Sequence, residues 1–315
     1  MTSLNIVFAG TPAFTCPALD AINASNHKLL ALYTQPDRPK GRGRSIQASA
    51  AKTWAVTHDI PVYQPINFKQ QAAIDELKAL NPDILVVIAY GLILPPEVLE
   101  IPRLGCINVH ASLLPYHRGA APIQYSILNA DTTTGVSIMQ MDAGMDTGPV
   151  FKTASCPISQ TTTTGELHDV LAELAARPLL EVLDNLASAN PATPSPQNNQ
   201  LATYAPKITP QDALINWSEP AITIANKIRA FNPFPIARTT AAGDMLKIHK
   251  AIALNQSANA APGSILDINK TGLFVATGDN ILQINTIQFA GGKAIAVSDW
   301  LNANKKTLNP GLMLT

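Results

Sequence analysis

The stretch CINVHASLLPYHRGAAPIQ, Cys106–Gln124, begins as an apolar strand and ends at the start of a helix rich in small residues. Between the two, Asn108 and His110 stand two residues apart and precede a Leu-Leu-Pro turn. Side chains two residues apart on a strand point to the same face. The stretch therefore predicts a buried strand whose last residues present an amide and an imidazole side by side.

The segments before this stretch alternate between apolar strands and helices. Strands are expected at LNIVFAG (4–10), KLLALYT (28–34) and DILVVIAY (83–90), with helices such as 12–25 and 71–80 between them. Strands that are apolar throughout are typical of a parallel sheet covered by helices on both faces. The fold class is therefore α/β with a Rossmann-like, mostly parallel sheet, and such sheets bind ligands beyond the carboxyl ends of their strands.

The pattern changes after a long amphipathic helix at 164–188. Residues 189–200, ANPATPSPQNNQ, are rich in Pro, Asn, Ser and Thr and have no apolar period, which indicates a linker. Beyond it, short strands separated by Gly and Asn turns predict a small β-barrel resembling an OB fold. The expected organisation is a catalytic domain at 1–188, a linker at 189–206 and a barrel at 207–315.

Composition excludes several classes of protein. The longest apolar run, 84–94, holds 11 residues and is too short to span a bilayer. The N-terminus lacks the pattern of a signal peptide, and Cys16, Cys106 and Cys156 form neither a disulfide framework nor a metal cluster. We therefore expect a cytoplasmic protein without a metal and without membrane association.

The net charge is zero but unevenly distributed. Residues 1–206 hold 12 Lys and Arg against 16 Asp and Glu, a charge of −4, and residues 207–315 hold 10 against 6, a charge of +4. A basic C-terminal third suggests a polyanionic partner, although a solvated surface explains the charge equally well.

The first strand is followed by FAGTPAF (8–14), which lacks the G-x-G-x-x-G pattern of dinucleotide sites. Gly10 is therefore expected to serve a tight strand-to-helix turn. A dehydrogenase on this sheet is disfavoured for the same reason.

The candidate chemistry lies in two places. An amide donor from Asn108 and a protonated His110 could together hold an oxyanion that develops on a carbonyl carbon under attack. Asp142 and Asp146 lie four residues apart in a Gly-rich loop, where either could be a simple turn residue. A carboxylate near His110 would favour the imidazolium and could accept a proton from an attacking amine. No nucleophile motif accompanies them, so the nucleophile is expected to come from a substrate.

Asn108, His110 and Asp146, with SLLP and DTGP around them, resemble the formyltransferases that use 10-formyltetrahydrofolate. Further segments make the chain similar to the methionyl-tRNA formyltransferases within that family, namely FAGTP, QPDRPKGRGR, AYGLILP, MDAGMDTG, RAFNPFP and AAPGSIL. The resemblance implies transfer of a formyl group from 10-formyltetrahydrofolate to the α-amine of methionyl initiator tRNA. It also implies that the enzyme is a monomer.

The resemblance assigns roles residue by residue. Asn108, His110 and Asp146 would be catalytic. The folate would contact two segments, the turn Ser112, Leu113, Leu114 and Pro115 and the loop Ala89, Tyr90, Gly91 and Leu92. The tRNA would contact Arg38, Lys40, Arg42 and Arg44, of which Arg42 is the strongest candidate, although a solvated basic loop is the alternative.

The chain departs from the family pattern at Tyr116-His117, where Arg-Trp is common. Related folate enzymes formylate glycinamide ribonucleotide or a sugar-nucleotide amine, or release formate. The predicted second domain disfavours the glycinamide enzyme, and the basic loop favours tRNA over a sugar nucleotide. An RNA-binding relative without catalysis is the remaining alternative, and the retained Asn108, His110 and Asp146 disfavour it.

Overall fold

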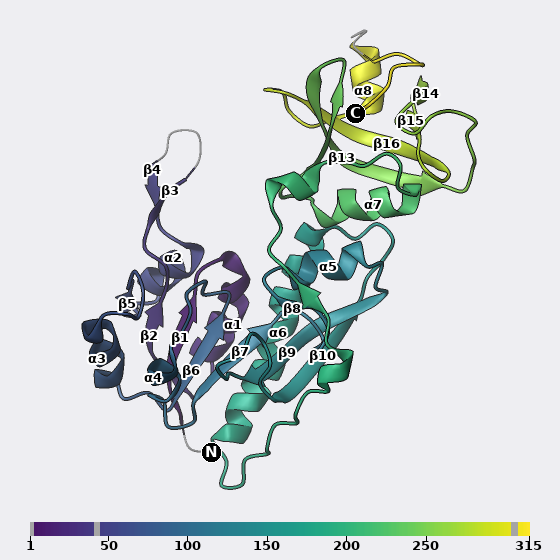
Figure 1. Cartoon of the computed structure of the whole chain (residues 1–315). Coiled ribbons are helices and arrows are strands. Elements are labelled where there is room, and N and C mark those ends of the chain that lie inside the picture. The colour runs from purple at the N-terminus through teal and green to yellow at the C-terminus, as the bar shows by residue number, and fades with distance from the viewer. Residues whose placement is uncertain (1–2, 41–44, 304–307) are drawn as a thin grey trace. The chain divides into compact units, whose positions relative to one another are not determined.

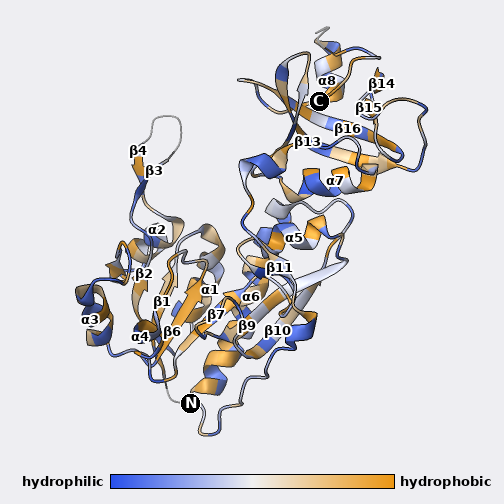
Figure 2. Ribbon diagram, in the orientation of Figure 1, coloured by the Kyte–Doolittle hydropathy of each residue, from blue (hydrophilic) through white to orange (hydrophobic). Residues whose placement is uncertain are grey.

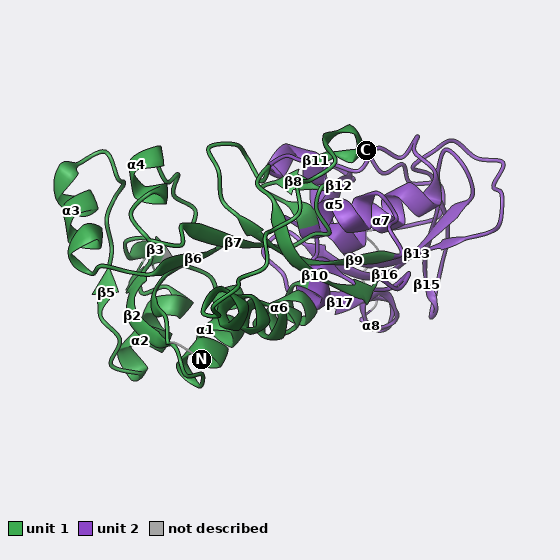
Figure 3. Ribbon diagram, turned by 90° about the horizontal axis from the view of Figure 1, so that it is seen from below, with its two compact units in different colours: residues 1–122, 133–157, 168–204 green, residues 123–132, 158–167, 205–315 purple. Residues whose placement is uncertain are grey.

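The computed structural model describes residues 3–40, 45–303 and 308–315. Contacts within the chain divide it into two compact units, coloured separately in Figure 3. The first unit holds residues 1–122, 133–157 and 168–204, and the second holds residues 123–132, 158–167 and 205–315.

The first unit is built on a seven-stranded sheet in the order β10-β9-β7-β6-β1-β2-β5 (Figure 1). Its strands are β1 (Asn5–Gly10), β2 (Lys28–Tyr33), β5 (Val62–Tyr63), β6 (Ile84–Ile88), β7 (Cys106–His110), β9 (Thr133–Gln140) and β10 (Val150–Pro157). Its helices are α1 (Cys16–Asn23), α2 (Ala50–Thr57), α3 (Gln71–Ala79) and α4 (Pro96–Leu99), while α5 (Pro122–Leu128) and α6 (Thr164–Leu186) contribute residues to both units. The smaller strands are β3 (Arg38–Lys40), β4 (Ser45–Gln47), β8 (Arg118–Gly119) and β11 (Tyr204–Ala205).

The central strands are parallel because helical crossovers connect them. β1 pairs in parallel with β2 and β6, and β6 pairs in parallel with β7. β9 and β10 are joined by a shorter loop and add antiparallel strands at one edge. All five residues of β6 are buried, and Figure 2 shows hydrophobic colouring along β1 and β6. The sheet is therefore apolar on both faces, as the sequence predicts.

Gly10 ends β1 in a crowded turn. A Cβ atom at this position would lie 2.6 Å from Thr15 Cγ2 and 2.9 Å from the Ile88 carbonyl oxygen. The glycine thus allows the first helix to begin directly beside the end of β6, in agreement with the predicted tight turn.

The second unit contains a separate antiparallel sheet in the order β12-β13-β16-β15-β14, with β17 paired to β16. Its elements are α7 (Ala221–Ala230), β12 (Ala237–Ala241), β13 (Asp244–Leu254), β14 (Ile265–Asn269), β15 (Gly272–Ala276), β16 (Ile281–Phe289), β17 (Ile295–Ala296) and α8 (Val297–Asn302). Its core is apolar and includes Trp217, Ile224, Ile248 and Trp300. A mostly parallel sheet followed by a small antiparallel β-unit confirms the predicted fold class.

The segment predicted as a linker is partly packed, because residues up to 204 belong to the first unit. Compact units need not coincide with functional domains, so the predicted organisation of a catalytic domain at 1–188, a linker at 189–206 and a barrel at 207–315 stays a prediction. Within the described ranges, every helix is too short or too polar to cross a lipid bilayer.

Candidate active site

The candidate site lies at the carboxyl end of β7, which pairs with β6 on one side and β9 on the other. Asn108 stands opposite Met139 and His110 opposite Ser137, so the two side chains occupy alternate positions of one strand. His110 is buried and Asn108 is half-buried. The fold therefore presents the amide and the imidazole on one face, as the sequence predicts.

Both nitrogens of His110 have identifiable neighbours. Nε2 lies 2.9 Å from the carbonyl oxygen of His117, and Nδ1 lies 3.6 Å from Oδ2 of Asp146. A carbonyl oxygen can only accept, so Nε2 must carry the proton in this contact. Nδ1 is left as the nitrogen that can change its protonation, and a proton on Nδ1 would form an ion pair with Asp146.

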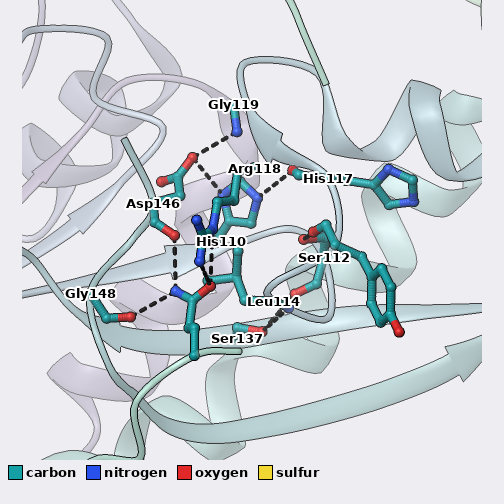
Figure 4. A network of polar contacts seen from close by, with 11 residues as sticks. His110, Ser112, Leu114, His117, Arg118, Gly119, Ser137, Asp146 and Gly148 are labelled. Atoms are coloured by element: carbon teal, nitrogen blue, oxygen red, sulfur yellow. Dashed lines mark hydrogen bonds and ion pairs between the residues drawn. The ribbon is translucent and has the colours of Figure 1, made fainter. Parts of the chain in front are cut away.

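Asp146 is fixed by its backbone and by its carboxylate. Its φ of 55° lies in the left-handed region, which aspartate tolerates better than most residues. Its Oδ2 accepts a hydrogen bond of 2.8 Å from the Gly119 amide, and dashed lines in Figure 4 join this oxygen to Gly119 and His110. The loop thus aims the carboxylate at the imidazole.

Asp142, the other carboxylate of this loop, has a structural role. Its Oδ1 accepts hydrogen bonds from the Gly144 amide at 2.9 Å and from the Thr147 hydroxyl at 2.8 Å. This arrangement is an Asx-type turn. Of the two carboxylates that the sequence left as alternatives, Asp146 is the one beside His110.

The Asp146 loop also depends on Gly148. A Cβ atom at this position would lie 1.8 Å from the Gln140 carbonyl oxygen, which belongs to a strand backbone and cannot move freely. We expect Gly148→Ala to lower the free energy of unfolding by about 1–3 kcal/mol, as overpacking usually does. Unfolding in urea would measure the change. Gly292→Ala is the control, because the nearest atom to its added Cβ is 3.3 Å away, and equal stability of the two variants would contradict the prediction.

The Asn108 carboxamide makes no side-chain hydrogen bond to any part of the chain that the structure describes. An amide in a half-buried position without a protein partner is available to donate to a bound group. Together with Nδ1 of His110 it forms a pair of polar groups on one face. Such a pair can stabilise negative charge that develops on a carbonyl oxygen.

The Ser112–Pro115 turn follows β7 directly and is held by internal hydrogen bonds. The Ser112 hydroxyl donates to the Tyr116 carbonyl at 2.5 Å, and the Ser137 hydroxyl donates to the Ser112 carbonyl at 2.7 Å and accepts from the Leu114 amide at 3.0 Å. The Ser112 oxygen is thus committed to the turn. Burial raises the pKa of the Cys106 thiol to about 12, so this residue stays a neutral thiol. Neither side chain is an activated nucleophile.

The Ala89–Leu92 segment follows β6, the strand next to β7. The Tyr90 carbonyl accepts hydrogen bonds from the Thr11 hydroxyl at 3.0 Å and from Gln35 Nε2 at 3.1 Å. Gly91 has a φ of 79°, and a Cβ on it would lie 2.3 Å from Gln35 Nε2. Because β6 and β7 are parallel neighbours, this segment and the Ser112–Pro115 turn lie at the same edge of the sheet.

The basic segment forms a short ribbon of β3 paired with β4. Arg38 is exposed on β3, Lys40 ends the same strand, and Arg42 and Arg44 lie outside the described residues. At the base of the ribbon, Lys52 Nζ donates to Asp37 at 2.7 Å. Hydrogen bonds from Lys52 and Gln64 lower the pKa of Asp37. Side chains of the first unit therefore anchor the ribbon where it leaves the sheet.

At the departure from the family pattern, Tyr116 is exposed and His117 is buried. His117 acts here through its backbone, because its carbonyl accepts from His110 and its amide donates to the Thr203 hydroxyl at 2.8 Å. This carbonyl cannot be predicted from the sequence, because no side-chain pattern reveals a backbone contact.

Two polar residues beside Asp146, Arg118 and Gln197, are not predicted from the sequence. Arg118 is buried and donates to Gln197 Oε1, while Gln197 Nε2 donates to the Asp146 carbonyl at 2.9 Å. Gln197 lies within the segment predicted as linker, where its composition gave no signal. The described residues contain no group of three or more His, Cys, Asp or Glu side chains that could hold a metal ion.

Comparison with family models gives two matches. The model described as "Formyl transferase" matches residues 4–183, and that described as "Formyl transferase, C-terminal domain" matches residues 207–305. Among solved structures, WlaRD, a sugar 3N-formyl transferase, superposes with a TM-score of 0.67 at 18% identity, covering 93% of this chain and 100% of that one. Methionyl-tRNA formyltransferase from Clostridium thermocellum gives a TM-score of 0.55 at 19% identity, covering 80% and 94%.

At the level of sequence, the chain is 59% identical over 314 residues to methionyl-tRNA formyltransferase of Legionella pneumophila subsp. pneumophila (strain Philadelphia 1), covering 100% of each chain. Such identity over the full length, together with both domain matches, extends well beyond the shared fold. The chain therefore belongs to the formyl transferase family and, within it, to the methionyl-tRNA formyltransferases.

Proposed function

We propose that this enzyme transfers a formyl group from 10-formyltetrahydrofolate to the α-amine of the methionine carried by initiator tRNA, for use in translation initiation. One N–C bond forms to the methionine amine, one N–C bond to N10 of the folate breaks, and one proton passes from the amine to N10. The observation that supports this most is the pairing of His110 with Asp146 beside the unbonded carboxamide of Asn108.

The three side chains have complementary roles in this proposal. The Asn108 carboxamide and a protonated Nδ1 of His110 donate to the oxygen that gains charge as the amine attacks. Asp146 balances the charge of the imidazolium and receives the proton that the amine loses, either directly or through water. The His117 carbonyl accepts from the other ring nitrogen, Nε2, so Nδ1 is the nitrogen that faces Asp146 and the developing charge.

The donor 10-formyltetrahydrofolate supplies an activated formyl carbon, and two segments of this chain are suited to hold it. The Ala89–Leu92 loop and the Ser112–Pro115 turn follow neighbouring parallel strands, at the edge where such sheets bind ligands. WlaRD was solved with 5-N-formyl-tetrahydrofolate, which is a related folate. Residues 89–92 and 112–115 are therefore proposed as the folate contacts.

The tRNA contacts are proposed on basic parts of the chain. Arg38, Lys40, Arg42 and Arg44 would contact phosphates near the acceptor end, and residues 207–315, with a charge of +4, would supply a second surface. Residues 1–188 would then act as the catalytic domain and 207–315 as the tRNA-binding domain. Because charged tRNA is the proposed substrate, we propose that the enzyme acts in the cytoplasm. We also propose that the enzyme is a monomer.

The direct test offers the enzyme labelled 10-formyltetrahydrofolate with either methionyl initiator tRNA or a sugar nucleotide that carries an amine. We expect label on the tRNA. Arg42→Ala should raise the KM for tRNA several-fold, leave the KM for folate unchanged, and lower the slope of tRNA affinity against salt by about one. Transfer to the sugar nucleotide without transfer to tRNA would refute the proposal.

A further inference from the structure

Residues 195–203, which we call the strap, run along the first unit beside the candidate site. At one end, the backbones of Ser195 and Val150 exchange hydrogen bonds of 2.8 and 2.9 Å. At the other end, the Thr203 carbonyl accepts from the Arg118 amide at 2.9 Å, and the Thr203 hydroxyl accepts from the His117 amide. The strap is thus attached at both ends, although its composition is that of a linker.

Gln197, near the middle of the strap, uses its whole amide group. Its Nε2 donates to the carbonyls of Asp146 at 2.9 Å and Gly148 at 2.7 Å. Its Oε1 accepts from Nε and Nη2 of Arg118 at 3.1 and 2.7 Å. Carbonyls only accept and a guanidinium only donates, so the amide has one possible orientation. Gly148, Asp146 and Arg118, the hydrogen-bond partners of this amide, are labelled in Figure 4.

Arg118 is the buried partner of Gln197 and Asn199 of the strap. It is 2% exposed, and its Nη2 also donates to Asn199 Oδ1 of the strap at 2.7 Å. A buried guanidinium needs acceptors in fixed positions, and the strap supplies two of them. Arg118 therefore fixes Gln197, and Gln197 fixes the loop backbone on both sides of Thr147.

Residues 117–119 contact both His110 and Asp146. The His117 carbonyl accepts a hydrogen bond from Nε2 of His110, and the Gly119 amide donates to the Asp146 carboxylate. Gln197 holds the Asp146 backbone from the opposite side. We propose that Gln197 is a positioning residue that, together with Arg118, sets the place of the Asp146 carboxylate relative to His110; its catalytic consequence rests on the proposed function.

The test compares Gln197→Ala and Gln197→Glu with Gln200→Ala. Gln197→Glu retains an acceptor for Arg118, so we expect the buried guanidinium to keep its partner. It loses both N–H donors to the carbonyls of Asp146 and Gly148, so the Asp146 loop is no longer held by this side chain. Gln200 is an exposed residue of the same type on the same strap, and its side chain makes no hydrogen bond to the described residues. We expect both Gln197 variants to lower kcat about 10- to 100-fold, because a shift of about 1 Å at a catalytic group can cost that much. The KM values for folate and tRNA should stay within about twofold.

A second measurement does not depend on the reaction. The ring resonances of His110, followed by NMR of the histidine side chains, should shift in both Gln197 variants and stay in place in Gln200→Ala. An unchanged His110 spectrum with unchanged kcat would overturn the inference while the proposed function stands, and so would an equal loss of kcat in Gln200→Ala. An unmodified enzyme that transfers no formyl group would refute the proposed function, and the His110 spectrum would still decide whether Gln197 positions the pair.

Discussion

Replacement of His110 with alanine is expected to lower kcat for formyl transfer about 10³-fold. The variant loses the donor to the charged oxygen and the partner of Asp146 together, and positioned acid-base groups typically contribute about 10²–10⁴ in rate. The KM for tRNA should change little, because the proposed tRNA contacts lie elsewhere on the chain. Single-turnover kinetics with saturating folate and methionyl-tRNA would measure the loss.

His110→Gln separates chemistry from structure at this position. A glutamine amide can still donate toward the His117 carbonyl that Nε2 contacts at 2.9 Å, but it has no second nitrogen that can be protonated. The His110→Gln enzyme should therefore be more stable to heat than His110→Ala, while its kcat for formyl transfer should be equally low. His168→Ala, which removes a histidine that also pairs with an aspartate, is the control and should keep full activity. A His110→Ala enzyme with near-normal kcat for formyl transfer would contradict the catalytic role of His110.

Asn108→Ala is expected to lower kcat by about 10²–10³, which is the usual cost of removing one oxyanion donor. Asn108→Asp should be worse, because a carboxylate of similar shape would place negative charge against the developing oxyanion. Folate affinity should stay within a few-fold in Asn108→Ala, since the donor acts on charge that is absent from the bound ground state. Equilibrium folate binding combined with single-turnover rates would distinguish the two effects.

The matched control for this position is Asn302→Ala, an exposed asparagine at the end of α8. It should have no effect on either measurement. If Asn108→Ala instead raised the folate dissociation constant in proportion to its loss of kcat/KM, Asn108 would be a binding residue and the oxyanion role would be wrong.

Much of the first unit could be predicted because hydrophobic burial determines it. Strands β1 and β6 are almost wholly apolar runs, and in β7 the placement of Asn108 and His110 on one face follows from the strand period alone. The prediction that Gly10 serves a turn, made because its sequence context lacks a dinucleotide pattern, is confirmed by the crowded turn after β1. The selection between Asp142 and Asp146 required the structure, since both lie in the same loop and differ in what their oxygens contact.

The parts that the sequence did not predict are held by polar contacts instead. The β3–β4 ribbon is not predicted, because its strands RPK and SIQ are too short to show a period of apolar and polar residues and the Pro and Gly around them are typical of a loop. Gln197 reaches Asp146 across 51 residues of sequence, and such a contact leaves no periodic trace in either segment. Hydrogen bonds between a side chain and a distant backbone carbonyl depend on tertiary placement, which local patterns do not encode.

The strap also bears on how such a protein can be recombined during evolution. A gene fusion that exchanges the C-terminal part at residue 188 would discard Gln197, Asn199 and Thr203, and it would leave the buried Arg118 guanidinium without the amide oxygens it now contacts. A junction placed after Thr203 would preserve these contacts. A fusion that joins another C-terminal unit to the seven-stranded sheet would therefore need to retain residues 189–203 to keep these contacts.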